Sequence, residues 1–139
     1  MRVGVAKESF PGENRVALTP NCIPALEKLG LSVVVETGAG LAAGYEDAAY
    51  VDKGATLVNH RSDVFDCDII VQVRAAGENP DVGSHDLPLL RPGKIVIAAC
   101  DALANLPLVM PIAKTGATLF ALELIPRITR AQSMDILSS

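Results

Sequence analysis

Residues 1–36 read MRVGVAKESFPGENRVALTPNCIPALEKLGLSVVVE, and the pattern of this segment gives the clearest indication of the fold class. Two short apolar runs, Arg2 to Ala6 and Ser32 to Glu36, are rich in valine and indicate strands. Between them an apolar stripe with helical spacing begins near Asn21 and stops at Gly30, the residue type that commonly follows the end of a helix. A strand, a helix and a second strand in this order predict a βαβ unit with parallel strands.

The same alternation continues along the rest of the chain. Apolar runs predict four more strands, at Thr56 to Val58, Ile69 to Val73, Ile95 to Ala99 and Thr118 to Leu122. Helical spacing predicts helices at Glu46 to Lys53 and Asn105 to Lys114. The stretch Arg74 to Gly93 contains several Gly and Pro residues, and we expect it to be a long loop with at most one helical turn. We therefore predict an α/β fold, a three-layer Rossmann/flavodoxin-like subdomain with a mostly parallel sheet.

Composition narrows the function classes. The formal net charge of −4 and the lack of a Lys/Arg cluster argue against a nucleic-acid or anionic membrane surface. The longest apolar runs, such as Ile95 to Cys100, are far shorter than the ~20 residues of a membrane helix. The cysteines Cys22, Cys67 and Cys100 lie far apart in apolar contexts, so we expect reduced, buried thiols and no metal site.

A long charged loop follows the first predicted strand, at the sheet edge where ligands bind in open α/β proteins. Its Lys7 and Arg15 are candidates for holding a carboxylate or a phosphate. The alternative is a surface loop in which these side chains pair with Glu8 and Glu13. Asp101, which follows the fifth predicted strand, is a further candidate at this edge.

The segment Gly38 to Ala43 formally matches the G-x-G-x-x-G/A dinucleotide pattern. That fingerprint normally follows the first strand of its unit and is answered about twenty residues later by an acid that holds the ribose. Here the corresponding strand end, Val58 to His60, carries no acid, so we interpret the glycines as a tight turn. His60 and His85 lie in predicted loops without triad partners, and we interpret them as solvated.

The final segment predicts a helix with a polar face. Thr129 to Gln132 matches a capping box, which indicates a helix start. Gln132, Asp135 and either Ser138 or Ser139 then recur at spacings of three and four, which places them on one side of that helix. Since no capping residue follows, we expect the sequence to stop within this element.

Two groups of motifs resemble a known superfamily. The N-terminal sequence shared by alanine dehydrogenases and the alpha subunit of nicotinamide nucleotide transhydrogenase is similar to two segments of this chain, Val3 to Glu8 and Pro11 to Pro20. The similarity extends to Val35 to Gly40 and to Gly54-Ala55. The segment Pro126 to Ser139, PRITRAQSMDILSS, resembles the transhydrogenase signature over its whole length.

The resemblance favours the transhydrogenases within that superfamily. Alanine dehydrogenases place a catalytic His after the fifth strand, where this chain has Ala99-Cys100-Asp101. Their pyruvate-binding Lys at the end of the fourth strand falls near Arg74. The resemblance implies that Arg127, Gln132, Asp135 and Ser138 contact the nicotinamide of NAD(H), with the first three aligning the ring for hydride transfer.

The resemblance also implies the organisation of a larger assembly. Residues 1–126 correspond to the first α/β subdomain of the NAD(H)-binding domain and 127–139 to the signature loop and the start of a connecting helix, so the dinucleotide-binding Rossmann unit is expected downstream. The implied enzyme is a homodimer that transfers hydride between NAD(H) and NADP(H) coupled to proton translocation. NADP(H)-binding and membrane-spanning partners would hold it at the cytoplasmic side of a bacterial inner membrane.

Under this interpretation the fragment alone is inactive, and the chain itself neither enters the membrane nor binds nucleic acid. The alternatives are an alanine dehydrogenase-like NAD-dependent oxidoreductase and a non-catalytic flavodoxin-like assembly module.

Overall fold

Six parallel strands form one sheet in the computed structural model, which describes residues 1–104, 106–125 and 130. The strands are β1 Arg2–Val5, β2 Ser32–Glu36, β3 Thr56–Val58, β4 Ile69–Arg74, β5 Ile95–Ala99 and β6 Thr118–Ala121. Their order is β3-β2-β1-β4-β5-β6, and every neighbouring pair is parallel. The predicted α/β class and all six predicted strands are confirmed, with a sheet that is wholly rather than mostly parallel.

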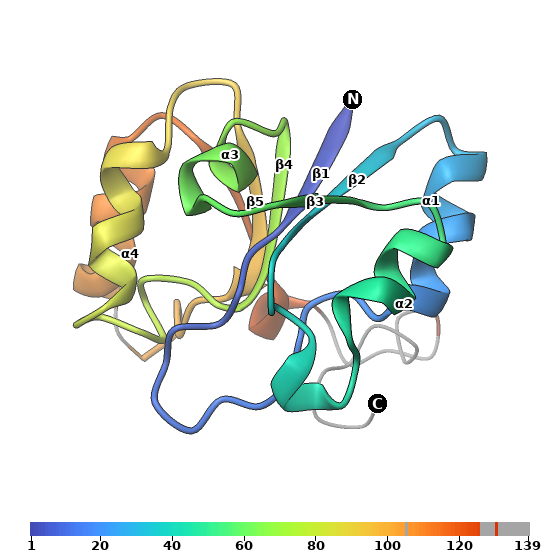
Figure 1. The fold of residues 1–139 in the computed structure, drawn as a ribbon. Helices are drawn as coiled ribbons and strands as arrows, with labels where there is room; N and C mark the ends of the chain where they lie inside the picture. The colour runs from blue at the N-terminus through green and yellow to red at the C-terminus, as the bar shows by residue number, and fades with distance from the viewer. Residues whose placement is uncertain (105, 126–129, 131–139) are drawn as a thin grey trace.

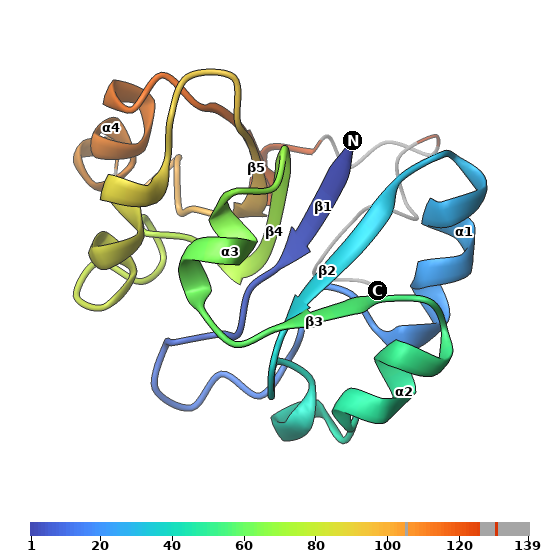
Figure 2. The same ribbon diagram turned by 45° about the horizontal axis from the view of Figure 1, so that its top comes forward.

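Helices cover both faces of this sheet (Figures 1 and 2). On one face lie α1 (Ile23–Lys28) and α2 (Asp47–Asp52), and on the other lie α3 (Arg61–Phe65), the 3-10 helix η3 (Gly83–Leu89) and α4 (Leu106–Lys114). Each face has its own apolar core because successive residues of a strand point to opposite sides. The predicted three-layer arrangement is therefore confirmed.

The helix boundaries correct the sequence-based expectations in several places. A 3-10 turn, Pro20–Cys22, precedes α1, which begins at Ile23 rather than near Asn21 and so places Pro24 in the first turn, where no amide donor is needed. The helix α3 was not predicted, because five residues are too few to show helical spacing. Within the stretch predicted as a long loop lies the seven-residue η3, which is more helix than the single short turn expected.

One area of the sheet surface is largely open among the described residues, with only the short 3-10 helix η4 (Leu122–Leu124) beside it. Across β4, β5 and β6, the face that carries Val71, Ile97 and Phe120 borders a groove of about 800 Å³ and a second hollow of about 650 Å³. Phe120 is accordingly 58% exposed. Within the described ranges, no helix has the length and apolar character needed to cross a membrane.

Candidate active site at the carboxyl edge of the sheet

The strand order places a topological switch point between β1 and β4. These strands are neighbours in the sheet, but the chain leaves them in opposite directions, from β1 toward β2 and from β4 toward β5. In open α/β sheets such a point leaves a crevice at the carboxyl ends of the strands, where ligands bind. The loop after β1 and the segment after β4 border this point, and both carry charged side chains.

Four side chains form what we call the Glu13 cluster: Glu13, Arg15, Arg74 and Glu78. The Glu13 carboxylate accepts hydrogen bonds from Nε and Nη2 of Arg15, at 2.8 and 2.9 Å, and from Nε of Arg74 at 2.7 Å. Nη1 of Arg74 donates to Glu78 at 3.0 Å, and its guanidinium lies 4.4 Å from the ring centre of Phe10. Both guanidinium groups are thus already bonded to carboxylates of the chain itself.

This environment strongly favours the ionised form of Glu13. Its side chain is only 4% exposed. The hydrogen bonds from Arg15, together with those from Arg74, lower the pKa of Glu13 from 4.5 to about 2, although burial acts in the opposite direction. Of the two alternatives for the first loop, the structure shows the one in which Arg15 pairs within the chain.

Glu8 attaches the first loop to the end of β4. Its carboxylate accepts from the backbone amides of Val73 at 2.6 Å and Arg74 at 3.1 Å, where the register between β4 and β5 shifts. Burial raises the pKa of Glu8, and the two backbone hydrogen bonds counteract some of that effect. The next residue, Ser9, accepts a hydrogen bond from the side chain of Asn79 at 2.9 Å, so two consecutive residues connect the loops on either side of the switch point.

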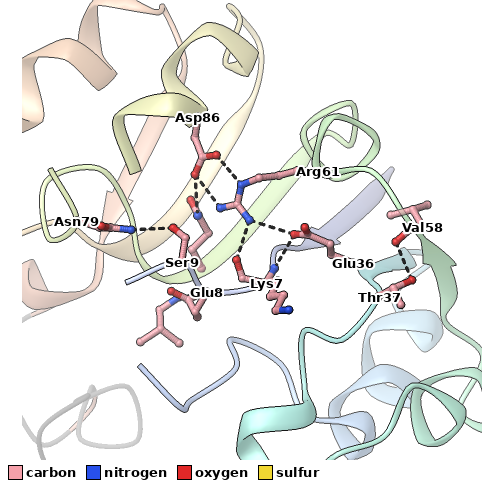
Figure 3. Close-up of polar contacts among 11 residues, drawn as sticks. Lys7, Glu8, Ser9, Glu36, Thr37, Val58, Arg61, Asn79 and Asp86 are labelled. Carbon is pink, nitrogen blue, oxygen red and sulfur yellow. Dashed lines mark hydrogen bonds and ion pairs between the residues drawn. The ribbon is translucent and has the colours of Figure 1, made fainter. Parts of the chain in front are cut away.

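Five residues form a second group, the Arg61 cluster: Lys7, Glu36, Arg61, Gln72 and Asp86 (Figure 3). Arg61 donates from Nε and Nη2 to the two carboxylate oxygens of Asp86, at 2.6 and 2.8 Å. Its Nη1 donates to the backbone carbonyl of Lys7 at 2.7 Å and to Glu36 at 3.0 Å. Glu36 also accepts from the Lys7 amide at 2.8 Å, and Gln72 donates to Asp86 at 3.3 Å.

The Gly38 to Ala43 segment is a structural turn, in agreement with the sequence-based interpretation. The Gly38 amide donates to the side chain of Asp47, the Ala39 amide to the Glu36 carbonyl, and the Leu41 amide to the Gly38 carbonyl. Because these amides are bonded within the chain, they do not form an open phosphate cradle. Gly40 is required for packing, because a Cβ there would lie 2.7 Å from the ring of Tyr50.

The remaining candidates have simpler surroundings. The backbone of Lys7 is bonded on both sides, and its ammonium lies near Gly38. Asp101 follows β5 with a φ of 55°, and the amides on either side of it donate to Glu123. Both histidines are exposed, as expected.

Two of the three cysteines match the expectation of buried thiols. Cys67 and Cys100 are buried, and burial raises the pKa of Cys100 to about 12. Cys22 is exposed, which corrects the prediction for that residue, because the turn at Pro20–Cys22 directs it away from the core. No group of three or more His, Cys, Asp or Glu side chains suited to a metal ion occurs in residues 1–104, 106–125 and 130.

The residues predicted to contact nicotinamide, Arg127, Gln132, Asp135 and Ser138, lie outside the described residues. Sequence reasoning missed Arg61 and Asp86, which are 25 positions apart and share no local pattern. The available signal was weak: Arg61 follows a strand and therefore lies near the carboxyl edge.

Comparison with known proteins identifies the family. The profile of the family described as "Alanine dehydrogenase/PNT, N-terminal domain" matches residues 4–139. The chain belongs to this alanine dehydrogenase/PNT N-terminal domain family. Among family relatives, the chain is 39% identical to NAD(P) transhydrogenase subunit alpha of Cereibacter sphaeroides, over 100% of this chain and 26% of that protein. The resemblance stated from the sequence motifs is confirmed.

Solved structures give the same result for the family fold. The structure of transhydrogenase from Sinorhizobium meliloti matches with a TM-score of 0.89 and 40% identity, covering 99% of this chain and 39% of that one. An L-alanine dehydrogenase matches with a TM-score of 0.82 and 28% identity, covering 94% and 34%. The chain therefore spans only between 26% and 39% of the length of these relatives.

Proposed function

We propose that this chain belongs to the NAD(H)-binding domain of an NAD(P) transhydrogenase alpha subunit. The complete enzyme would transfer hydride between NAD(H) and NADP(H) and couple the transfer to proton translocation. Similarity to a transhydrogenase subunit over the whole chain supports this proposal, whereas an alanine dehydrogenase of Staphylococcus saprophyticus aligns over 53% of the chain.

The pairing of both arginines at the switch point with carboxylates of the chain carries the proposal. An enzyme that acts on a 2-oxo acid needs a cation open to the substrate carboxylate. Here Glu13 and Glu78 already accept from the guanidinium groups of Arg15 and Arg74. No histidine follows β5, where alanine dehydrogenases place their catalytic one. This arrangement supports chemistry between two nicotinamides rather than on an amino acid.

The proposed catalytic residues act by alignment. Bound nicotinamide supplies or accepts the hydride, so the protein needs no proton-transfer group at the ring. The carboxamide of nicotinamide can be bonded, and the rotation of its ring fixed, by the amide of Gln132, the hydroxyl of Ser138 and the charged pair of Arg127 and Asp135. NADP(H) would be held by a partner domain or subunit.

The chain alone is proposed to be inactive and to bind NADH weakly. The glycine turn after β2 is bonded internally, so the described residues fit the nicotinamide end of the ligand better than its pyrophosphate. The cradle for that group would come from the downstream unit. We further propose that the complete protein is a homodimer at the cytoplasmic side of a bacterial inner membrane, held there by membrane-spanning partners.

Hydride transfer between nucleotides in the complete protein tests the proposal. We expect NADH-dependent reduction of a spectrally distinct NADP analogue by membranes that contain the complete enzyme. Gln132→Ala and Asp135→Ala should slow single-turnover transfer more than they weaken NADH binding, while Asp52→Asn, an exposed change at the end of α2 and beside the opposite edge of the sheet, serves as the control. Unchanged single-turnover rates in both variants would count against the assigned roles.

The same preparation separates the alternatives. NADH oxidation that depends on pyruvate and ammonium would support an alanine dehydrogenase-like enzyme. Failure of the complete protein to bind any nicotinamide nucleotide, measured by calorimetry, would support a non-catalytic assembly module.

A further inference from the structure

Arg61 connects four different segments of the carboxyl edge through one guanidinium group. It lies at the start of α3 and bonds Asp86 in η3, Glu36 at the end of β2 and the backbone of Lys7 after β1. Its side chain is 24% exposed, and the two carboxylates are 15% and 10% exposed. Charge-assisted hydrogen bonds in such partly buried surroundings are stronger and more directional than those on an open surface.

The peptide groups around Lys7 are held from both sides. The Lys7 amide donates to Glu36, and the Lys7 carbonyl accepts from Arg61, which itself bonds Glu36 (Figure 3). The planar guanidinium can satisfy Asp86, Lys7 and Glu36 together because its donors point in fixed, different directions. A lysine ammonium carries the same charge but lacks this planar fork.

The position of Lys7 sets the positions of the two residues that follow it. Glu8 bonds the amides of Val73 and Arg74, and Ser9 bonds Asn79. Arg74 in turn bonds Glu13 in the first loop. The contacts therefore run without interruption from Arg61, through the backbone of the first loop, to both sides of the switch point.

We propose that Arg61 and Asp86 are positioning residues, which hold the loops after β1 and β4 in the arrangement that hydride transfer requires. This inference rests on the proposed function, because it assigns the switch point to the nicotinamide end of the ligand. Neither residue needs to touch the nucleotide. Both act through Lys7, Glu8 and the end of β4.

Arg61→Lys in the complete enzyme is the main test, with Asp86→Asn as a second variant in case the first does not fold. The matched control is Lys94→Met: Lys94 is also a cation bonded to backbone carbonyls, those of Asp66 and Cys67, but it lies at the opposite edge of the sheet. Backbone amide exchange, followed by mass spectrometry in segments 70–80 and 94–100, and single-turnover hydride transfer are measured for each protein.

For Arg61→Lys we expect exchange in segment 70–80 to accelerate about tenfold, with segment 94–100 unchanged. Hydride transfer should slow by about tenfold to a hundredfold while KM for NADH changes less than about twofold, because misalignment affects the reacting geometry more than binding. The control should leave exchange in segment 70–80 and the transfer rate within about twofold of the parent enzyme.

Two results would overturn the inference. One is exchange in segment 70–80 that is no faster in Arg61→Lys and Asp86→Asn than in Lys94→Met. The other is a normal transfer rate despite faster exchange. If the parent enzyme transfers no hydride between nucleotides but the exchange pattern appears, the proposed function has failed, and the hold of Arg61 on the two loops is supported.

Discussion

Glu13→Gln removes the negative charge between two guanidinium groups and is expected to destabilise the protein at neutral pH. The pKa of Glu13 falls from 4.5 to about 2 on folding, a difference of at most about 3.5 kcal/mol at roughly 1.4 kcal/mol per pH unit. The Arg15 side chain is 62% exposed, so solvent screens some of that attraction. We therefore expect the free energy of unfolding to drop by about 1–2 kcal/mol at pH 7, measured by urea denaturation.

The pH dependence gives the sign of this contribution. Because folding lowers the pKa of Glu13, its stabilisation is present above about pH 4.5 and is lost as the pH falls toward 2. The difference between parent and Glu13→Gln should therefore shrink over that range. Glu46→Gln is the control, since Glu46 is exposed and makes no side-chain cap bond at α2. Equal stability of the two variants at pH 7, or a Glu13→Gln difference that persists at pH 2, would show that the ionised Glu13 carboxylate does not stabilise the fold.

Three further predictions concern packing, backbone conformation and the reactivity of the thiols. Gly77→Ala should lower the free energy of unfolding by about 2–3 kcal/mol, because a Cβ there overlaps the carbonyl oxygen of Cys100. Gly12→Ala should lower the free energy of unfolding by only about 1 kcal/mol, because Gly12 has a φ of 84° but no neighbour within 4 Å. Asp101→Val should destabilise by about 1–2 kcal/mol more than Asp101→Asn in urea denaturation, because the φ of 55° suits Asn and not a β-branched residue. Iodoacetamide at about pH 8 should label the exposed Cys22 in the native protein. Cys100, whose burial raises its pKa to about 12, should be labelled only after denaturant is added, and mass spectrometry measures the labelling of both thiols.

The strands could be predicted from the sequence because parallel strands buried on both faces appear as continuous apolar runs. Ile95–Ala99 and Ser32–Glu36 match their predicted bounds, and β4 differs by one residue at its end. Short helices are harder to predict, because a single turn does not repeat. This explains why α3 was missed and why η3 was expected as no more than one turn.

The polar edge could be predicted only to a limited extent. Glu13 and Arg15 lie two residues apart, and their pairing was one of the two alternatives that the sequence offered for the first loop. The contact between Glu8 and Val73 spans 65 positions, and that between Arg61 and Asp86 spans 25. Such contacts follow from the order of the strands, which places the first loop beside the end of β4 and places α3, on its way from β3 to β4, beside η3. The identity of the charged residues was visible in the sequence, but partners that lie far apart along the chain were not.

The balance of charge at the edge indicates which end of a dinucleotide fits there. The two clusters and Glu8 bring together five carboxylates, three guanidinium groups and one ammonium group. The carboxylates are those of Glu8, Glu13, Glu36, Glu78 and Asp86, and the cations are Arg15, Arg61, Arg74 and Lys7. These nine side chains carry a formal net charge of −1, and each of the three guanidinium groups is bonded to a carboxylate. An anionic pyrophosphate would be repelled there, whereas a nicotinamide ring, neutral when reduced and positive when oxidised, would not. Under the proposed function, this charge balance favours an orientation with the nicotinamide at the switch point and the phosphates held by other groups.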